Sequence, residues 1–113
     1  MKKTAIFVLI FVFAFSLAYA HPPQDIQITF DGDAKILKAV ITHITSNPDA
    51  HRIAKVDIGL NGKEIIEHKI SIQDNNNTQA VTYLIPDARP GDIISVEAYC
   101  SISGTLTKQI KVK

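Results

Sequence analysis

The sequence predicts an all-β protein, namely an immunoglobulin-like antiparallel β-sandwich of about seven strands. Three observations support this prediction. From residue 21 onward, apolar and polar residues alternate with the period of two that is typical of half-buried strands, and no stretch has helical spacing. Turn-forming pairs such as Asn61-Gly62 and Pro90-Gly91 separate the alternating segments. Seven such short segments are the strand content of an immunoglobulin-like sandwich.

The first 20 residues have the three parts of a secretory signal. Lys2-Lys3 is the basic start, 5–17 is the apolar run, and Ala18-Tyr19-Ala20 is the small-residue exit. The apolar run is shorter than the roughly 20 residues that a membrane-spanning helix needs. We therefore expect cleavage after Ala20, export to the periplasm or the extracellular space, no membrane attachment after cleavage, and a single domain at residues 21–113.

The first three predicted strands precede the Asn61-Gly62 turn. Asp31-Gly32-Asp33 is a turn between the first two strands, and His43 continues the apolar phase of the second. The residues expected to face the core are Ile26, Ile28 and Phe30, then Leu37, Ala39 and Ile41, then Ala54, Val56, Ile58 and Leu60.

Four more strands follow, and the polar run Gln73–Gln79 is expected to be a loop between the first two of them. His68 lies in an apolar phase and is expected to be structural. The apolar faces are Ile66, His68, Ile70 and Ile72, then Val81, Tyr83 and Ile85, then Ile94, Val96, Ala98, Cys100 and Ile102, then Leu106, Ile110 and Val112.

Composition excludes several functional classes. The formal net charge is +1, residues 21–113 contain no basic run, and their only aromatic residues are Phe30, Tyr83 and Tyr99, which is unlike a nucleic-acid-binding surface. The chain contains no phosphate-binding glycine loop and no nucleophile elbow. Cys100 is the only cysteine, so no internal disulfide can form. Its alternative roles are a buried thiol, a metal ligand or an intermolecular cross-link.

The remaining candidate chemistry is a set of histidines. His43 and His51 flank one loop, so that two imidazoles either converge on an ion or lie separately on the surface. Cleavage after Ala20 would make His21 the first residue, and its amine and imidazole would then chelate a metal as in a histidine brace. The alternative is that His21-Pro22-Pro23 is only a spacer behind the leader.

The segment from His43 to Gly104 resembles the iron domain of superoxide reductases (desulfoferrodoxin and neelaredoxin). The resemblance implies an immunoglobulin-like fold and a ferrous ion bound by four histidines and one axial cysteine thiolate. It implies ligand roles for His43, His51 and Cys100, with His21 as the extra ligand. The matching motifs are His43, His51-Arg52-Ile53, Val56-Asp57-Ile58, Asn61-Gly62, Pro90-Gly91-Asp92 and Ala98-Tyr99-Cys100-Ser101-Ile102-Ser103-Gly104.

The chain departs from the family pattern at several positions. Ser103 replaces the last histidine, Arg52 replaces an aromatic residue, and the Glu-Lys pair beside the family's first histidine is absent. Together with the leader, the resemblance implies an exported superoxide-reductase-like protein with one metal ion, iron first and copper or zinc as alternatives, and weak or altered redox activity. Superoxide and an electron-donor protein would be its partners. The alternative hypothesis is a non-catalytic binding module, resembling the sandwich subunits of sulfur-oxidation complexes, which would bind a protein through strand edges and the Gln73–Gln79 loop.

Overall fold

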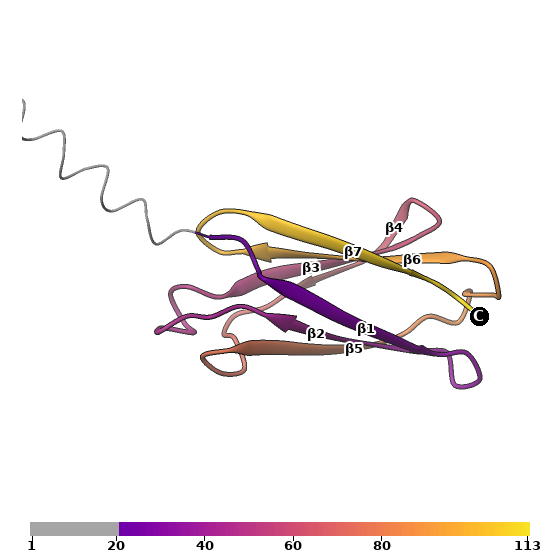
Figure 1. Cartoon of the computed structure of the whole chain (residues 1–113), viewed down its shortest axis with the longest axis horizontal. Helices are drawn as coiled ribbons and strands as arrows, with labels where there is room; N and C mark the ends of the chain where they lie inside the picture. The colour runs from indigo at the N-terminus through magenta and orange to yellow at the C-terminus, as the bar shows by residue number, and fades with distance from the viewer. Residues whose placement is uncertain (1–20) are drawn as a thin grey trace, which may run out of the picture.

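The structure is a computed structural model and describes residues 21–113; the predicted leader, residues 1–20, lies outside the described residues (Figure 1). Seven strands follow one another along this part of the chain, which contains no helix. They are β1 (Asp25–Asp31), β2 (Ile36–Thr42), β3 (Ile53–Leu60), β4 (Lys63–Lys69), β5 (Thr78–Leu84), β6 (Ile93–Cys100) and β7 (Thr105–Lys111).

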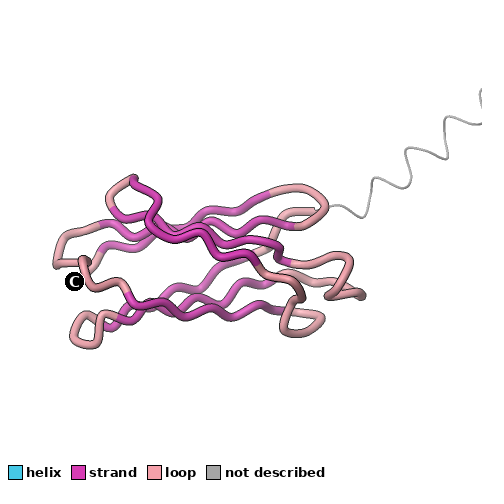
Figure 2. Tube along the Cα trace, turned by 180° about the vertical axis from the view of Figure 1, so that it is seen from behind, coloured by secondary structure: helices cyan, strands magenta, loops and turns pink. Residues whose placement is uncertain are grey.

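The strands form two antiparallel sheets that lie face to face (Figure 2). The three-stranded sheet has the order β1-β2-β5, and the four-stranded sheet has the order β4-β3-β6-β7. The connections from β2 to β3, from β4 to β5 and from β5 to β6 cross between the layers, as in immunoglobulin-like sandwiches. The predicted all-β sandwich is confirmed.

The core consists of aliphatic side chains from the inner faces of both sheets, and they follow the alternation seen in the sequence. One lateral edge, where β1 contacts β7, carries an ion pair between Lys108 Nζ and Asp25 Oδ1 at 2.7 Å. The buried core residues are Ile26, Leu37, Ala39, Ile41, Ile53, Val56, Ile58, Ile70, Val81, Ile85, Ala88, Ile94, Val96, Ala98 and Val112.

Three details of the sequence-based strands are wrong. His68 is exposed rather than part of an apolar core face, and its Nδ1 lies 2.8 Å from the hydroxyl of Tyr83 across the two sheets. Strand β4 ends at Lys69, so Ile72 is 57% exposed. Strand β6 ends at Cys100, and Ile102 lies in the following turn with 53% exposure. For Ile72 and Ile102 the alternation was extended beyond the end of the strand, whereas His68 is paired with Val56 within β4 but lies on an edge strand that leaves it exposed.

Within residues 21–113 the fold contains no helix of the length and apolar character needed to cross a bilayer.

Candidate metal centre

Three histidines meet at one end of the sandwich. The ring centroids of His21 and His43 are 5.0 Å apart, those of His21 and His51 are 4.9 Å apart, and those of His43 and His51 are 4.8 Å apart. One nitrogen from each ring lies within 4.8 Å of one nitrogen of each of the others. The segment before β1 and the two ends of the β2–β3 loop thus present three imidazoles at a separation that one bound ion can bridge.

His43 follows the last residue of β2 and is fully buried. Its backbone N–H donates to the carbonyl of Asn77 at 2.9 Å, and its Nδ1 lies 2.8 Å from Oε1 of Gln73. Gln73 is only 2% exposed, although the sequence places it at the start of a loop. The position of the His43 ring is therefore set by the segment that enters β5.

The hydrogen bonds of Gln73 fix the tautomer of His43. Gln73 Oε1 accepts the N–H of Ile53 at 2.9 Å, while its Nε2 donates to the carbonyl oxygens of His43 and Asn75, both at 2.8 Å. This orientation makes Oε1 an acceptor, so the Nδ1 of His43 must donate to it. Nε2 of His43 is then unprotonated, buried and without a hydrogen-bond partner in the described structure. Its lone pair is available to a metal.

His51 is held by a short, ordered loop. Asn47 Oδ1 accepts the backbone N–H groups of Asp49 (3.2 Å) and Ala50 (3.3 Å), and the carbonyl of Asn47 accepts the N–H of His51 at 2.8 Å. Arg52 Nε donates to the carbonyl of Ile70 at 2.9 Å and fastens the loop to the end of β4. Nε2 of His51 is also buried and lacks a partner among the described atoms.

His21 is positioned by a close backbone contact. Gly104 has φ +95°, and a Cβ at this position would lie 2.8 Å from Cβ of Pro22 and 2.9 Å from its N and Cα. Only glycine therefore allows the segment before β1 to pass against the β6–β7 turn. Gln24 completes the attachment, because its N–H donates to the carbonyl of Thr42 at 2.8 Å.

Replacing Gly104 with alanine is expected to push Pro22 away and to weaken metal binding by at least about 10-fold, as losses of supporting contacts do. The matched control is Gly62→Ala, because Gly62 has φ +86° but no atom lies within 4 Å of the place that a Cβ would take there. In both variants backbone strain should lower the free energy of unfolding by about 1–3 kcal/mol. Only Gly104→Ala should also show a lower metal affinity, measured by calorimetric titration. Equal affinities in the two variants would contradict the positioning of His21 by this contact.

Cys100 lies at the same end of the fold but does not join the three imidazoles. Cys100 ends β6, pairs with Ile53 and is 8% exposed, and its Sγ accepts the N–H of Ile102 at 3.4 Å. It does not belong to the group of mutually close ligand atoms. Its ligand role, implied by the resemblance, therefore remains a prediction that the geometry does not support.

Burial and the neighbouring imidazoles lower the pKa values of His43 and His51. Burial is the main cause that lowers the pKa of His43, and the nearby His51 and His21 lower it further, while its bond to Gln73 opposes the shift. Burial, followed by the charge of His21, also lowers the pKa of His51. Both shifts favour the neutral form of these two imidazoles, which is the form that binds metals.

These lowered pKa values predict that the metal-free protein loses stability on acidification. An unfolded histidine takes up a proton near pH 6.5, whereas folded His43 and His51 resist it until lower pH. The free energy of unfolding, measured with urea in the presence of a chelator, should therefore fall as the pH drops below about 6.5. In a variant with both residues replaced by glutamine this slope should be smaller. An unchanged slope would contradict the shifts.

Sequence reasoning found all three histidines but missed the residues that orient them. Gln73 was assigned to a polar loop, and nothing in its neighbourhood marks it as buried. For His21 a signal was available in Gly104, a glycine in the motif that carries the resemblance, because this residue lets Pro22 pass close to the β6–β7 turn.

Comparison with solved structures finds a likeness in fold. Among solved structures the chain is similar to superoxide reductase (neelaredoxin) from Ignicoccus hospitalis, with 16% sequence identity, a TM-score of 0.47, and coverage of 88% of this chain and 86% of that chain. No protein-family model and no curated protein matches the chain. At this identity and score, the chemistry of the centre has to be argued from its own residues.

Proposed function

We propose that the protein binds one transition-metal ion through the imidazoles of His21, His43 and His51. The observation that carries the proposal is the pair of buried Nε2 atoms, on His43 and His51, that have no hydrogen-bond partner in the described structure. A buried polar atom without a partner is costly, and a metal ion would satisfy both nitrogens at once. The bond from His43 to Gln73 is the kind of outer contact that supports metal-binding histidines.

The donor set suits several borderline metals. Imidazole binds iron, copper and zinc, and a three-histidine set leaves at least one coordination position open. Iron or copper would supply one-electron redox chemistry at this site, whereas zinc would supply a Lewis acid. The set does not reproduce the four histidines and one thiolate implied by the superoxide reductase resemblance, because Ser103 is not an imidazole and Cys100 is outside the group.

We propose that iron is the metal bound first of all, and that the protein is exported and reduces superoxide slowly or in an altered way. The support is the order of motifs from His43 to Gly104, together with the leader-like residues 1–20. Burial of His43 excludes water from one side of the centre, and the His21 side is half exposed and gives access to a small molecule. An electron-donor protein would be required for turnover.

The test is the metal content of the protein purified after processing of its leader. We expect about one ion per chain, with nanomolar or tighter retention during dialysis, as for other sites with several histidine ligands. Less than about 0.1 equivalent of iron, copper and zinc, in the isolated protein and after reconstitution, would overturn the proposal. Stopped-flow measurement of superoxide decay then tests the redox activity separately.

We further propose that cleavage after Ala20 adds a fourth nitrogen ligand, the free amine of His21. The support is that the predicted cleavage site directly precedes a residue whose ring already lies with the other two imidazoles. In the present structure Nδ1 of His21 lies 3.0 Å from the carbonyl of Pro22, and the amine-plus-Nδ1 chelate requires the ring to exchange that contact for the metal. Copper favours such nitrogen-rich sets.

The amine ligand is tested by adding one glycine in front of His21. This extension leaves all three imidazoles in place but moves the free amine away from the ring. We expect copper affinity to fall by at least about 10-fold, on the scale of supporting contacts, while zinc affinity changes less. Equal copper affinity with and without the glycine would exclude the amine and leave the three-imidazole site standing.

A protein-binding module is the second candidate, and one observation favours it. Ile44, Ile72 and Ile102 are 49%, 57% and 53% exposed, and all three lie in loops at the end of the sandwich that carries the histidines. Exposed apolar side chains near a site are typical of surfaces that bind proteins. The Gln73–Gln79 loop contributes less to such a surface than expected, because Gln73 and Gln79 are buried. A metal-free protein that still binds a partner would favour this candidate.

A further inference from the structure

A second group of ligand atoms lies on the outer face of the four-stranded sheet, on strands β3 and β4. One carboxylate oxygen from each of Asp57, Glu64 and Glu67 lies within 4.8 Å of one from each of the others. Asp57 is at the middle of β3, and register pairs it directly with Glu67 on one side and with Glu97 of β6 on the other. Three like charges therefore stand in one row across adjacent strands, an arrangement that is destabilising without a counter-charge.

A β-bulge brings the third carboxylate to this face. Asp57 pairs with Glu67 and Ile58 pairs with Ile66, but the next partner of β3 is Glu64, which leaves Ile65 as the extra residue of β4. In a regular strand Glu64 and Glu67 would point to opposite faces, because they are three positions apart. The bulge re-aims Glu64 so that both glutamates flank Asp57.

One carboxylate oxygen of Asp57 has no hydrogen-bond donor among the described residues. The residue is only 8% exposed, and its Oδ1 is buried without a hydrogen-bond partner in the described part of the chain. Its other oxygen, Oδ2, lies 3.4 Å from Nζ of Lys55. Beside it is a shallow hollow lined by Asp57, Gly59, Glu64 and Ser95, among others. A buried carboxylate oxygen without a donor is suited to a cation.

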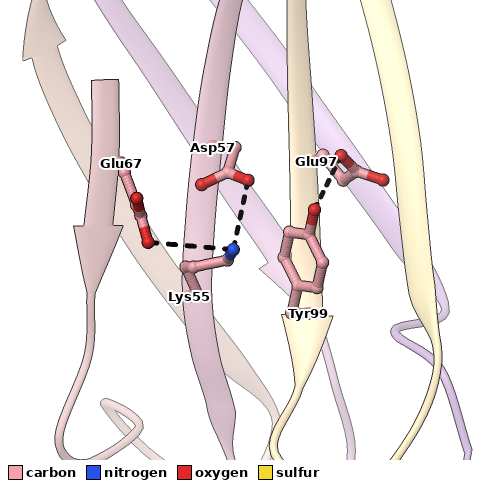
Figure 3. Close-up of polar contacts among 5 residues, drawn as sticks. All are labelled: Lys55, Asp57, Glu67, Glu97 and Tyr99. Carbon is pink, nitrogen blue, oxygen red and sulfur yellow. Dashed lines mark hydrogen bonds and ion pairs between the residues drawn. The ribbon is translucent and has the colours of Figure 1, made fainter. Parts of the chain in front are cut away.

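Lys55 is the resident positive charge of this group (Figure 3). Its ammonium lies between Asp57 and Glu67, 3.4 Å from Oδ2 of the former and 3.8 Å from Oε2 of the latter. It also lies 4.2 Å from the centre of the Tyr99 ring, whose hydroxyl donates to Glu97. One lysine cannot neutralise three carboxylates, and the ring of Tyr99 provides a favourable place for the ammonium if a stronger cation displaces it.

We propose that Asp57, Glu64 and Glu67 form a binding site for a hard divalent cation, calcium above all, that is separate from the histidine centre. All the ligands are oxygens, the class that calcium, magnesium and manganese prefer. The two glutamates are exposed and free to adjust, which suits the flexible coordination of calcium better than the strict octahedron of magnesium. The expected dissociation constant is in the range of about 0.1–1 mM, as in extracellular modules.

The test is calcium titration of the purified protein, followed by calorimetry and by thermal unfolding. Asp57→Asn keeps the shape of the side chain but removes its charge, and we expect calcium affinity to fall by more than about 10-fold. Lys55→Met removes the competing ammonium and should tighten calcium binding by several-fold while lowering the unfolding temperature without calcium. The control is Asp87→Asn, the same charge change at an exposed position away from this face.

Two results would overturn the site. One is a thermal unfolding curve that 10 mM calcium, about ten times the weakest expected dissociation constant, leaves unchanged in both the wild type and Lys55→Met. The other is equal calcium affinity in Asp57→Asn and Asp87→Asn. His51→Ala removes a ligand of the histidine centre and should leave calcium binding unchanged. The calcium site and the histidine centre are therefore tested independently of each other.

Discussion

Replacing His51 with alanine should reduce bound transition metal from about one ion per chain to less than about 0.1 after dialysis against a chelator. The reason is that three imidazoles form the described group, so the change removes one of its three imidazole ligands. Loss of a supporting contact alone costs about 10–100-fold in metal affinity, and loss of a ligand should cost more than 100-fold. Titration with zinc and copper by calorimetry measures the change.

His51 is the most informative of the three positions. It is half-buried, whereas His43 is fully buried and its removal would leave a cavity in the fold. The control is His68→Ala, because His68 is an exposed histidine that contacts Tyr83 and does not belong to the group. If His51→Ala retains metal as well as His68→Ala does, the ion is bound elsewhere and the proposed centre is wrong.

Replacing Gln73 with leucine should destabilise the protein and weaken metal binding together. Leucine has a similar volume but cannot accept from Ile53 N–H and His43 Nδ1–H or donate to the carbonyls of His43 and Asn75. Two buried donors without an acceptor cost about 1–3 kcal/mol each, so we expect a loss of about 3 kcal/mol in the free energy of unfolding. Urea unfolding of the metal-free protein measures it.

The second effect of Gln73→Leu distinguishes a positioning role from a purely structural one. Without Oε1 of Gln73 the tautomer of His43 is no longer fixed, and metal affinity should fall by about 10–100-fold. Gln27→Leu is the control, since Gln27 is exposed on β1 and makes no contact with the centre. A variant that is less stable but binds metal with unchanged affinity would show that Gln73 supports only the fold.

The fold was accessible from the sequence because one face of nearly every strand is apolar. The alternation of Leu37, Ala39 and Ile41, and that of Ile94, Val96 and Ala98, is retained in full as buried positions of β2 and β6. Strand β4 was harder to predict, because it is a mostly exposed edge strand with a bulge at Ile65. Its outward and inward residues therefore do not follow a single period of two.

The histidine centre was only partly accessible. His43 and His51 flank one loop, which is a local signal, and His21 follows the predicted cleavage site. Their convergence with the supporting Gln73 depends on how two sheets pack, and no local pattern contains that information. Cys100 was proposed from the family resemblance alone, and its ligand role stays a prediction, because the end of β6 places it outside the imidazole group.

In the proposed centre three imidazoles hold the metal without the thiolate of Cys100. X-ray absorption fine structure of the reconstituted protein tests it most directly. We expect nitrogen or oxygen neighbours of the metal at about 2.0–2.2 Å, with outer scattering from imidazole rings, and no sulfur neighbour at about 2.3 Å. A sulfur neighbour at that distance, or the absence of imidazole scattering, would contradict the three-histidine centre.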